Sequence, residues 1–184
     1  MPGITRVADG LAARLALLAC LLASVPVLAA TQGRFGYRAV VEGQAFETRF
    51  TVYRVTPAID ERGMPFGFDV EIDLRAIDSG DGERDAEMRA AEWFDVESHP
   101  TARYRSTRVT NADGDGRIMQ GELTVKGVTR ALDVPFTWQP FPTGAQLRGV
   151  VSVDRRWFGV GPADEASVGA FVEVAFDLRW EPRE

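Results

Sequence analysis

The residues from Arg84 to Pro100, RDAEMRAAEWFDVESHP, combine the kinds of side chain that an active site would need. This stretch holds arginines, several carboxylates, the aromatic pair Trp93–Phe94 and the only histidine of the chain, His99. Nucleophilic catalysis would require a nucleophile held beside a base, but the sequence has no Gly-x-Ser-x-Gly turn and no second histidine. We therefore interpret His99 as a loop residue with a solvated or hydrogen-bonded structural role.

A second candidate for chemistry is NADGDGRIMQGE, from Asn111 to Glu122, which matches the ligand spacing of a calcium-binding loop. Such a loop lies between two helices, whereas the residues on both sides of this stretch alternate as strands do. We favour an acidic, glycine-rich hairpin turn, and calcium binding remains the alternative.

The elements that must position these residues have a period of two. In FGFDVEIDL, apolar side chains from Phe66 to Leu74 alternate with polar ones, which predicts a strand with one apolar face. The carboxylates of Asp69, Glu71 and Asp73 lie close enough for acid–base chemistry. Because they fall on the opposite face from the apolar residues, we interpret them as solvated.

About eight such strands are predicted, and eight antiparallel strands suffice to close a barrel that is filled or holds one small ligand. A two-sheet sandwich is the competing architecture. The predicted strands are 34–42, 46–54, 66–74, 101–109, 117–125, 130–138, 145–153 and 171–180.

One helix is predicted between the third and fourth strands, from Glu83 to Trp93, with Asp81 as its N-cap. Its inward stripe would be formed by Ala86, Ala90 and Trp93 or Phe94. Asp85 and Arg89 are spaced to form a surface pair worth a few tenths of a kcal/mol. This pattern is typical of a helix that covers a barrel or its open end.

Residues 1–30 are predicted to be a signal peptide, with Arg6 and Arg14 before an apolar run and small residues up to Ala30. Cleavage there predicts export to the periplasm and a single domain over residues 31–184, and lipidation of Cys20 is the alternative. Without the leader the chain has 19 basic and 26 acidic residues. This acidic balance disfavours nucleic acid as a partner.

Three motifs give the sequence a family resemblance. They are IDLRAIDSGDGERDAEMRAAEWFDVESHPTARYRST (72–107), GELTVKGVTRALDVPF (121–136) and RRWFGVG (155–161). In this order and spacing they resemble the YceI-like family of exported lipid-binding proteins. The residues that match its motifs are Arg84, Asp85, Trp93, Phe94, Pro100, Gly121, Leu123, Thr124, Gly127, Phe158, Gly159 and Gly161. The N-terminus departs from the family pattern, because it has the aromatic residues but not the histidines.

The resemblance implies a lipocalin-like barrel that holds an isoprenoid lipid, such as a polyprenyl quinone, with no catalytic residue and no required cofactor or metal. A membrane donor or acceptor protein and a homodimer are further partners that it allows. The alternatives are a barrel enzyme acting on an apolar substrate and a filled barrel that binds a partner. The predicted ligand-binding residues are Phe68, Val70, Ile72, Leu74, Trp93, Phe94, Tyr104, Leu123, Val125, Leu132, Val134, Phe136, Leu147, Val151, Phe158, Val174 and Phe176. Arg108 shares the parity of Tyr104, and we hypothesise that it meets a ligand head group; a solvated position at the rim is the favoured alternative.

Overall fold

The computed structural model describes residues 32–164 and 167–180, so the predicted signal peptide and Cys20 lie outside the described residues. Its strands are β1 (Gln32–Val41), β2 (Gln44–Phe50), β3 (Tyr53–Ile59), β4 (Pro65–Asp73), β5 (Ile77–Asp78), β6 (Thr101–Asn111), β7 (Gly116–Val125), β8 (Val128–Phe141), β9 (Gly144–Asp154) and β10 (Phe171–Trp180). Two 3₁₀ turns, η1 (Leu74–Ala76) and η2 (Arg155–Phe158), follow β4 and β9, and α1 is Gly82–Arg89. None of these helices is long and apolar enough to span a bilayer.

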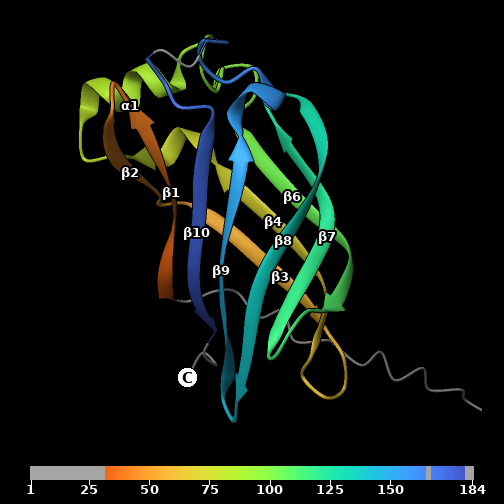
Figure 1. Ribbon diagram of the computed structural model, residues 1–184. Helices are drawn as coiled ribbons and strands as arrows, with labels where there is room; N and C mark the ends of the chain where they lie inside the picture. Colours follow the sequence, from red (N-terminus) through yellow and green to blue (C-terminus); the bar gives the residue numbers. More distant parts are fainter. Residues whose placement is uncertain (1–31, 165–166, 181–184) are drawn as a thin grey trace, which may run out of the picture.

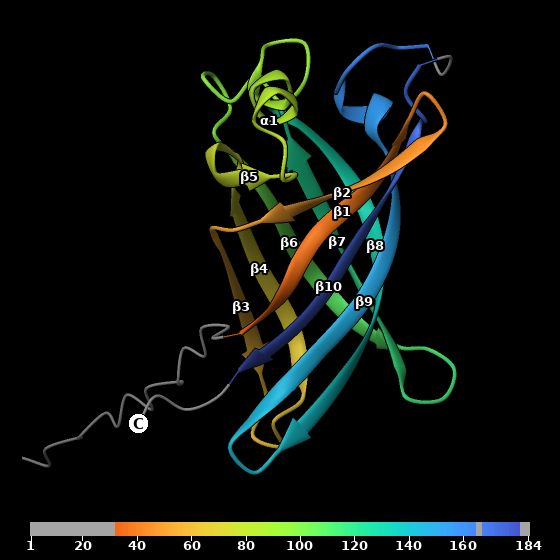
Figure 2. The same ribbon diagram turned by 90° about the vertical axis from the view of Figure 1, so that its left-hand side faces the viewer.

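The strands form one antiparallel sheet of ten, in the order β3-β4-β6-β7-β8-β9-β10-β1-β2-β5. The sheet curls strongly, and α1 lies over one end of it (Figures 1 and 2). Its two terminal strands, β3 and β5, do not pair with each other, so the sheet is a curled half-barrel. The prediction of an all-β antiparallel fold is confirmed, whereas the prediction of a closed barrel of about eight strands is wrong.

The barrel does not close because the segment predicted as a single strand over 46–54 contributes to two different strands. The chain leaves the β2 ladder after Phe50, and β3 starts at Tyr53 against β4 instead. Where hydrogen bonding between strands stops, aromatic rings fill the seam. Phe35 of β1 packs edge-on against Tyr53 of β3, with 5.3 Å between ring centroids, and against Phe50, at 5.1 Å. The alternation of apolar and polar side chains does not show that this segment divides between β2 and β3.

The predicted inward faces of the later strands are confirmed. Val134, Phe136 and Trp138 of β8 and Leu147 and Val153 of β9 are buried. Gly149 also occupies an inward position of β9 but has no side chain. A Cβ at this position would lie 2.3 Å from the ring of Phe176 on β10. The glycine therefore gives an inward ring the space to lie across the neighbouring strand.

One residue of β6 is placed differently from its predicted parity. The β6–β7 register shifts between Ser106 and Arg108, which is the signature of a β-bulge. The extra residue returns Arg108 to the outer face, where it is exposed, and turns Val109 toward the core. Arg108 is therefore solvated, as the favoured alternative predicts, and the hypothesis that it meets a ligand head group inside the sheet is wrong.

The helix differs from its prediction in length and in its inward residue. Asp81 caps it as predicted, accepting from the N–H groups of Glu83 and Arg84, but α1 ends at Arg89. Met88 is buried, whereas Ala86 and Ala90 are exposed. The contacts of Met88 with Tyr37 of β1 and Thr48 of β2 go with this orientation. In chain order α1 follows β5 rather than the third strand. The reason is that the segment predicted as the second strand contributes to both β2 and β3, and that β5 was not predicted.

The predicted surface pair between Asp85 and Arg89 is replaced by other contacts. Asp85 accepts from the N–H and hydroxyl of Ser79, at 2.9 and 2.6 Å. Arg89 donates to the carbonyls of Arg75 and Ile77, at 3.1 and 3.0 Å. Both residues thus fasten the start and end of α1 to the segment that precedes it.

The remaining two predicted loops behave as expected. Residues 111–116 are a hairpin turn between β6 and β7, with Ala112 N–H donating to the carbonyl of Gly116 at 2.9 Å. His99 lies in the loop before β6, where its Nε2 is 3.8 Å from a carboxylate oxygen of Asp95. Its ring also lies against Gly127, so the interpretation of His99 as a structural residue is confirmed.

Candidate functional site

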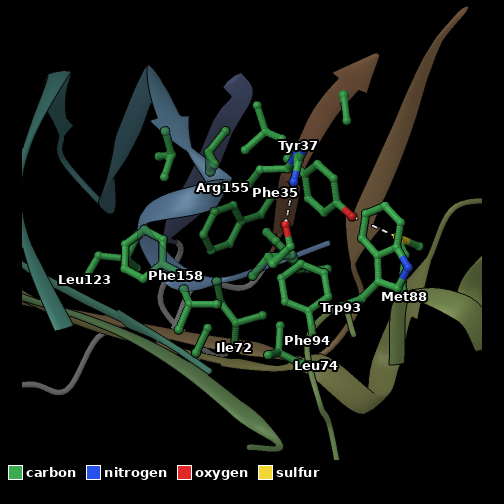
Figure 3. A pocket seen from close by; sticks show the side chains of 18 of the residues that line it. Phe35, Tyr37, Ile72, Leu74, Met88, Trp93, Phe94, Leu123, Arg155 and Phe158 are labelled. Carbon is green, nitrogen blue, oxygen red and sulfur yellow. Dashed lines mark hydrogen bonds between the residues drawn. The ribbon is translucent and has the colours of Figure 1, made fainter. Parts of the chain in front are cut away.

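An apolar cavity of about 890 Å³ fills the inside of the curled sheet beneath α1. Its wall is built from the inward side chains of the strands, and its cover comes from the residues around α1 and η2 (Figure 3). All of the predicted ligand-binding side chains except Phe136 line it. Their contact with a ligand stays a prediction.

The end of the sheet away from α1 is closed by aromatic rings. Phe136 belongs to this floor: it packs edge-on against Phe68, with 5.4 Å between ring centroids. Trp138 lies 5.5 Å from Trp180, which is fully buried, and donates its indole N–H to the carbonyl of Gly63 at 2.9 Å. The floor of the cavity is therefore closed by packed rings.

The cover joins two motifs that are distant in sequence. Trp93 lies against Gly161, where an added Cβ would come within 2.8 Å of the indole. Gly161 N–H donates to the carbonyl of Glu92 at 3.0 Å, and Lys126 Nζ bridges the carbonyls of Glu92 and Gly159 at 3.2 and 2.9 Å. The turn after α1 and the loop after η2 are thus fastened to each other across the cavity.

Replacing Gly161 by Ala is expected to loosen this cover. Gly161 has φ +69°, so alanine would cost about 1–2 kcal/mol in backbone strain, and its Cβ would also displace Trp93. We expect a faster exchange of any bound lipid, measured by transfer to vesicles. Gly159→Ala is the matched control, because Gly159 has φ +63° but no atom within 4 Å of an added Cβ. Equal exchange rates in the two variants would contradict this role of the Gly161–Trp93 contact.

The loop after η2 is organised by a buried arginine. Arg155 is 4 % exposed and donates to the backbone carbonyls of the loop that follows it. These acceptors are Val160 (2.9 Å), Pro162, Asp164 (3.1 Å), Val168 (2.7 Å) and Gly169 (2.9 Å). One side chain thereby satisfies the carbonyls of an irregular segment that forms a wall of the cavity mouth.

Two titratable groups in or beside the cavity wall, Tyr104 and Asp154, are hydrogen-bonded within the protein. Tyr104 donates its hydroxyl to the carbonyl of Met119 at 2.8 Å, and burial raises its pKa. Asp154, beside Arg155, caps η2, and its hydrogen bonds from Arg156 hold its pKa below the usual range. The Tyr104 hydroxyl and the Asp154 carboxylate are thus engaged in the wall rather than presented to the cavity. In the described part of the chain, no group of three potential metal ligands is gathered.

Several lining residues were missed by sequence reasoning, among them Phe35, Tyr37, Phe50, Met88 and Arg155. The first two follow the weak alternation of 34–42, which could have assigned them to the inner face. Arg155 continues the inward parity of the preceding strand, so a charged residue at an inward position was the available signal. Met88 had no such signal, because its burial depends on contacts with Tyr37 and Thr48, which lie 51 and 40 positions away in the sequence.

The architecture is found in known proteins. A family model described as a YceI-like domain matches residues 27–180. A UPF0312 protein of Pectobacterium carotovorum is 30% identical over 116 residues, which cover 59% of this chain and 57% of that protein. A UPF0312 protein of Pseudomonas aeruginosa is 32% identical over 89 residues, covering 48% and 43%. The matched part of the chain thus spans about half the length of these relatives.

Two solved structures share the fold. BcnA of Burkholderia cenocepacia superposes with a TM-score of 0.75 at 23% identity, covering 80% of this chain and 95% of that one. A polyisoprenoid binding domain from Saccharophagus degradans gives a TM-score of 0.64 at 18% identity, covering 85% and 98%. At these identities the likeness shows the arrangement of strands and helix.

Proposed function

Because the chain belongs to the YceI-like domain family, we propose that it is a non-enzymatic periplasmic protein that binds an isoprenoid lipid, such as a polyprenyl quinone. The observation that carries the proposal is the apolar cavity of about 890 Å³ inside the curled sheet. The polyisoprenoid binding domain among its structural neighbours supports the same class of ligand. The apolar run of residues 1–30 supports export.

The size of the cavity limits the chain that it can enclose. A methylene group is about the size of a water molecule, whose share of liquid volume is roughly 30 Å³. A cavity of about 890 Å³ then encloses roughly 30 carbons, or about six isoprene units. A longer isoprenoid would leave part of its chain or its head group at the mouth near α1.

The energetics favour reversible carriage or storage. Burying roughly 30 methylenes from water at about 0.8 kcal/mol each would exceed the practical ceiling of about 20 kcal/mol for a non-covalent complex. Such a lipid starts in a membrane, however, where its chain is already dry. Transfer into an apolar cavity therefore changes the free energy little, and shape and head-group contacts set the occupancy.

The two alternative functions are less well supported by the same site. The two groups that the sequence offered for catalysis do not serve it here, because the Tyr104 hydroxyl donates to the carbonyl of Met119 and Arg108 lies on the outer face. A filled barrel serving only as a partner-binding module is inconsistent with an interior cavity of this volume. Binding without catalysis is thus the function that the geometry supports best.

Extraction of the protein from its native compartment tests the proposal. We expect organic solvent to release a prenyl lipid in roughly stoichiometric amount, identified by mass spectrometry, from protein purified without detergent. The same extraction of an unrelated exported protein from the same preparation controls for carry-over. A protein that releases no lipid, and that takes up none from prenyl-lipid vesicles, would contradict the proposed function.

A further inference from the structure

A small polar cluster interrupts the apolar lining below α1. The hydroxyl of Tyr37 on β1 donates to the sulfur of Met88 on α1, at 2.8 Å (Figure 3). Thr48, directly opposite Tyr37 in the β1–β2 ladder, is 1 % exposed, and its hydroxyl lies 4.0 Å from the same sulfur. A thioether is a weak acceptor, so the Tyr37 hydroxyl makes a weaker hydrogen bond here than an oxygen acceptor would allow.

The surroundings make this hydroxyl a neutral donor. The Tyr37 ring lies 5.8 Å from Phe50 and 6.4 Å from Phe46 and from Phe94, measured between ring centroids. Burial among these rings raises the pKa of Tyr37 to about 12, so its proton is retained at physiological pH. Because Tyr37 keeps its proton and the Met88 sulfur is a weak acceptor, a ligand oxygen can replace that sulfur as the acceptor of the hydrogen bond.

We propose that Tyr37 is the head-group contact of the cavity, and that its hydroxyl transfers its hydrogen bond from Met88 to an acceptor oxygen of an uncharged lipid head group. This assignment rests on the proposed function and adds the class of head group and the residue that hydrogen-bonds to it. The ligands that fit are isoprenoids with a carbonyl or ether oxygen at one end. Met88 holds the hydroxyl in place when no ligand oxygen is present.

The mouth of the cavity argues against an anionic head group. Its exposed rim carries the carboxylates of Glu42, Asp81, Glu83, Glu87 and Glu92. The two cations of the lining are otherwise engaged: Arg84 lies 3.4 Å from Asp81 and 4.8 Å over the ring of Phe46, while Arg155 donates to loop carbonyls. A phosphate at this rim would meet like charge, which disfavours it relative to a neutral head group.

Three probes with six isoprene units each test the assignment: a hexaprenyl benzoquinone, the bare hydrocarbon squalene, and hexaprenyl diphosphate. Each is offered in phosphatidylcholine vesicles, and the ratio of protein-bound to vesicle-bound probe is measured by mass spectrometry. In Tyr37→Phe we expect the quinone ratio to fall about threefold to tenfold, as for one lost hydrogen bond, and the squalene ratio to stay constant. The diphosphate should bind least to the native protein, and lowering the salt concentration should disfavour it further.

Two further variants keep the result interpretable. Tyr53→Phe makes the same chemical change outside the cavity lining, in the seam against Phe35, and should leave every ratio unchanged. Met88→Leu removes the competing sulfur and should raise the quinone ratio about twofold. If Tyr37→Phe leaves the quinone ratio at the native value, the head-group assignment is overturned while lipid binding stands. If the native protein takes up none of the probes, including squalene, the proposed function itself fails.

Discussion

Replacing Val151 by Asn is expected to lower lipid occupancy by roughly fivefold to a hundredfold, because stripping water from a buried amide costs about 1–3 kcal/mol. Val151 lies in the middle of the wall on β9, opposite Val174, and lines the cavity. Without lipid, the cavity has room for water to hydrate the new amide, so the fold should lose little stability. A lipid chain would have to displace that water. Occupancy is measured by extraction after equilibration with prenyl-lipid vesicles.

The adjacent residue supplies the matched control for this experiment. Val150 is 54% exposed, since it points to the outer face of the same strand. Val150→Asn therefore introduces the same amide one residue away without touching the cavity, and it should bind lipid as the native protein does. Equal losses in both variants, or no loss in either, would show that the β9 wall does not contact the ligand.

Replacing Arg155 by Met is expected to destabilise the fold by about 3 kcal/mol, because the carbonyls that it satisfies lose a buried charged donor. For a domain of this size, such a loss lowers the Tm by about 6–12 °C. Thermal unfolding followed by circular dichroism measures it. We also expect faster proteolysis within the loop after η2, because the contacts of Arg155 hold that loop against the sheet.

Arg148→Met provides the comparison for the loss of an arginine as such. Arg148 lies on the same strand, β9, but its side chain is 57% exposed and pairs with Asp177 at 3.1 Å. Exposed pairs contribute about 0–1 kcal/mol, so this variant should unfold within a few degrees of the native protein. If Arg155→Met also unfolded within a few degrees of it, Arg155 would have no organising role in the loop.

The largest difference between the expected and the observed fold concerns the way the sheet ends. A period of two shows which side of a strand is apolar, but it carries no information on which strands meet. The passage from β2 to β3 at residues 51–52 and the short strand β5 depend on contacts with β4 and η1. One example is the hydrogen bond from Thr51 N–H to the carbonyl of Ala76, at 3.3 Å. The number of strands and the closure therefore could not be predicted from alternation.

Single-residue errors had equally specific causes. The bulge between Ser106 and Arg108 shifts the register of β6 by one residue, and a shift of one moves every later side chain to the other face. Met88 is buried rather than Ala86 because its side chain packs against Tyr37 of β1 and Thr48 of β2. Both features are set by contacts with residues of neighbouring strands.

The sequence by itself determined the inward faces of the later strands, the cap of α1 at Asp81, the hairpin at 111–116 and the family resemblance. The first three depend on residues within a few positions of one another, where backbone geometry fixes the direction of a side chain. The resemblance depends on three motifs whose order and spacing are visible in the sequence itself. Only the tertiary structure decided the open seam, the Trp93–Gly161 contact, the carbonyl set of Arg155 and the polar cluster at Tyr37. The Trp93–Gly161 contact and the Tyr37–Met88 contact join residues 68 and 51 positions apart, and the carbonyls that Arg155 contacts belong to an irregular loop. In each case the approach is fixed by packing and not by a local pattern.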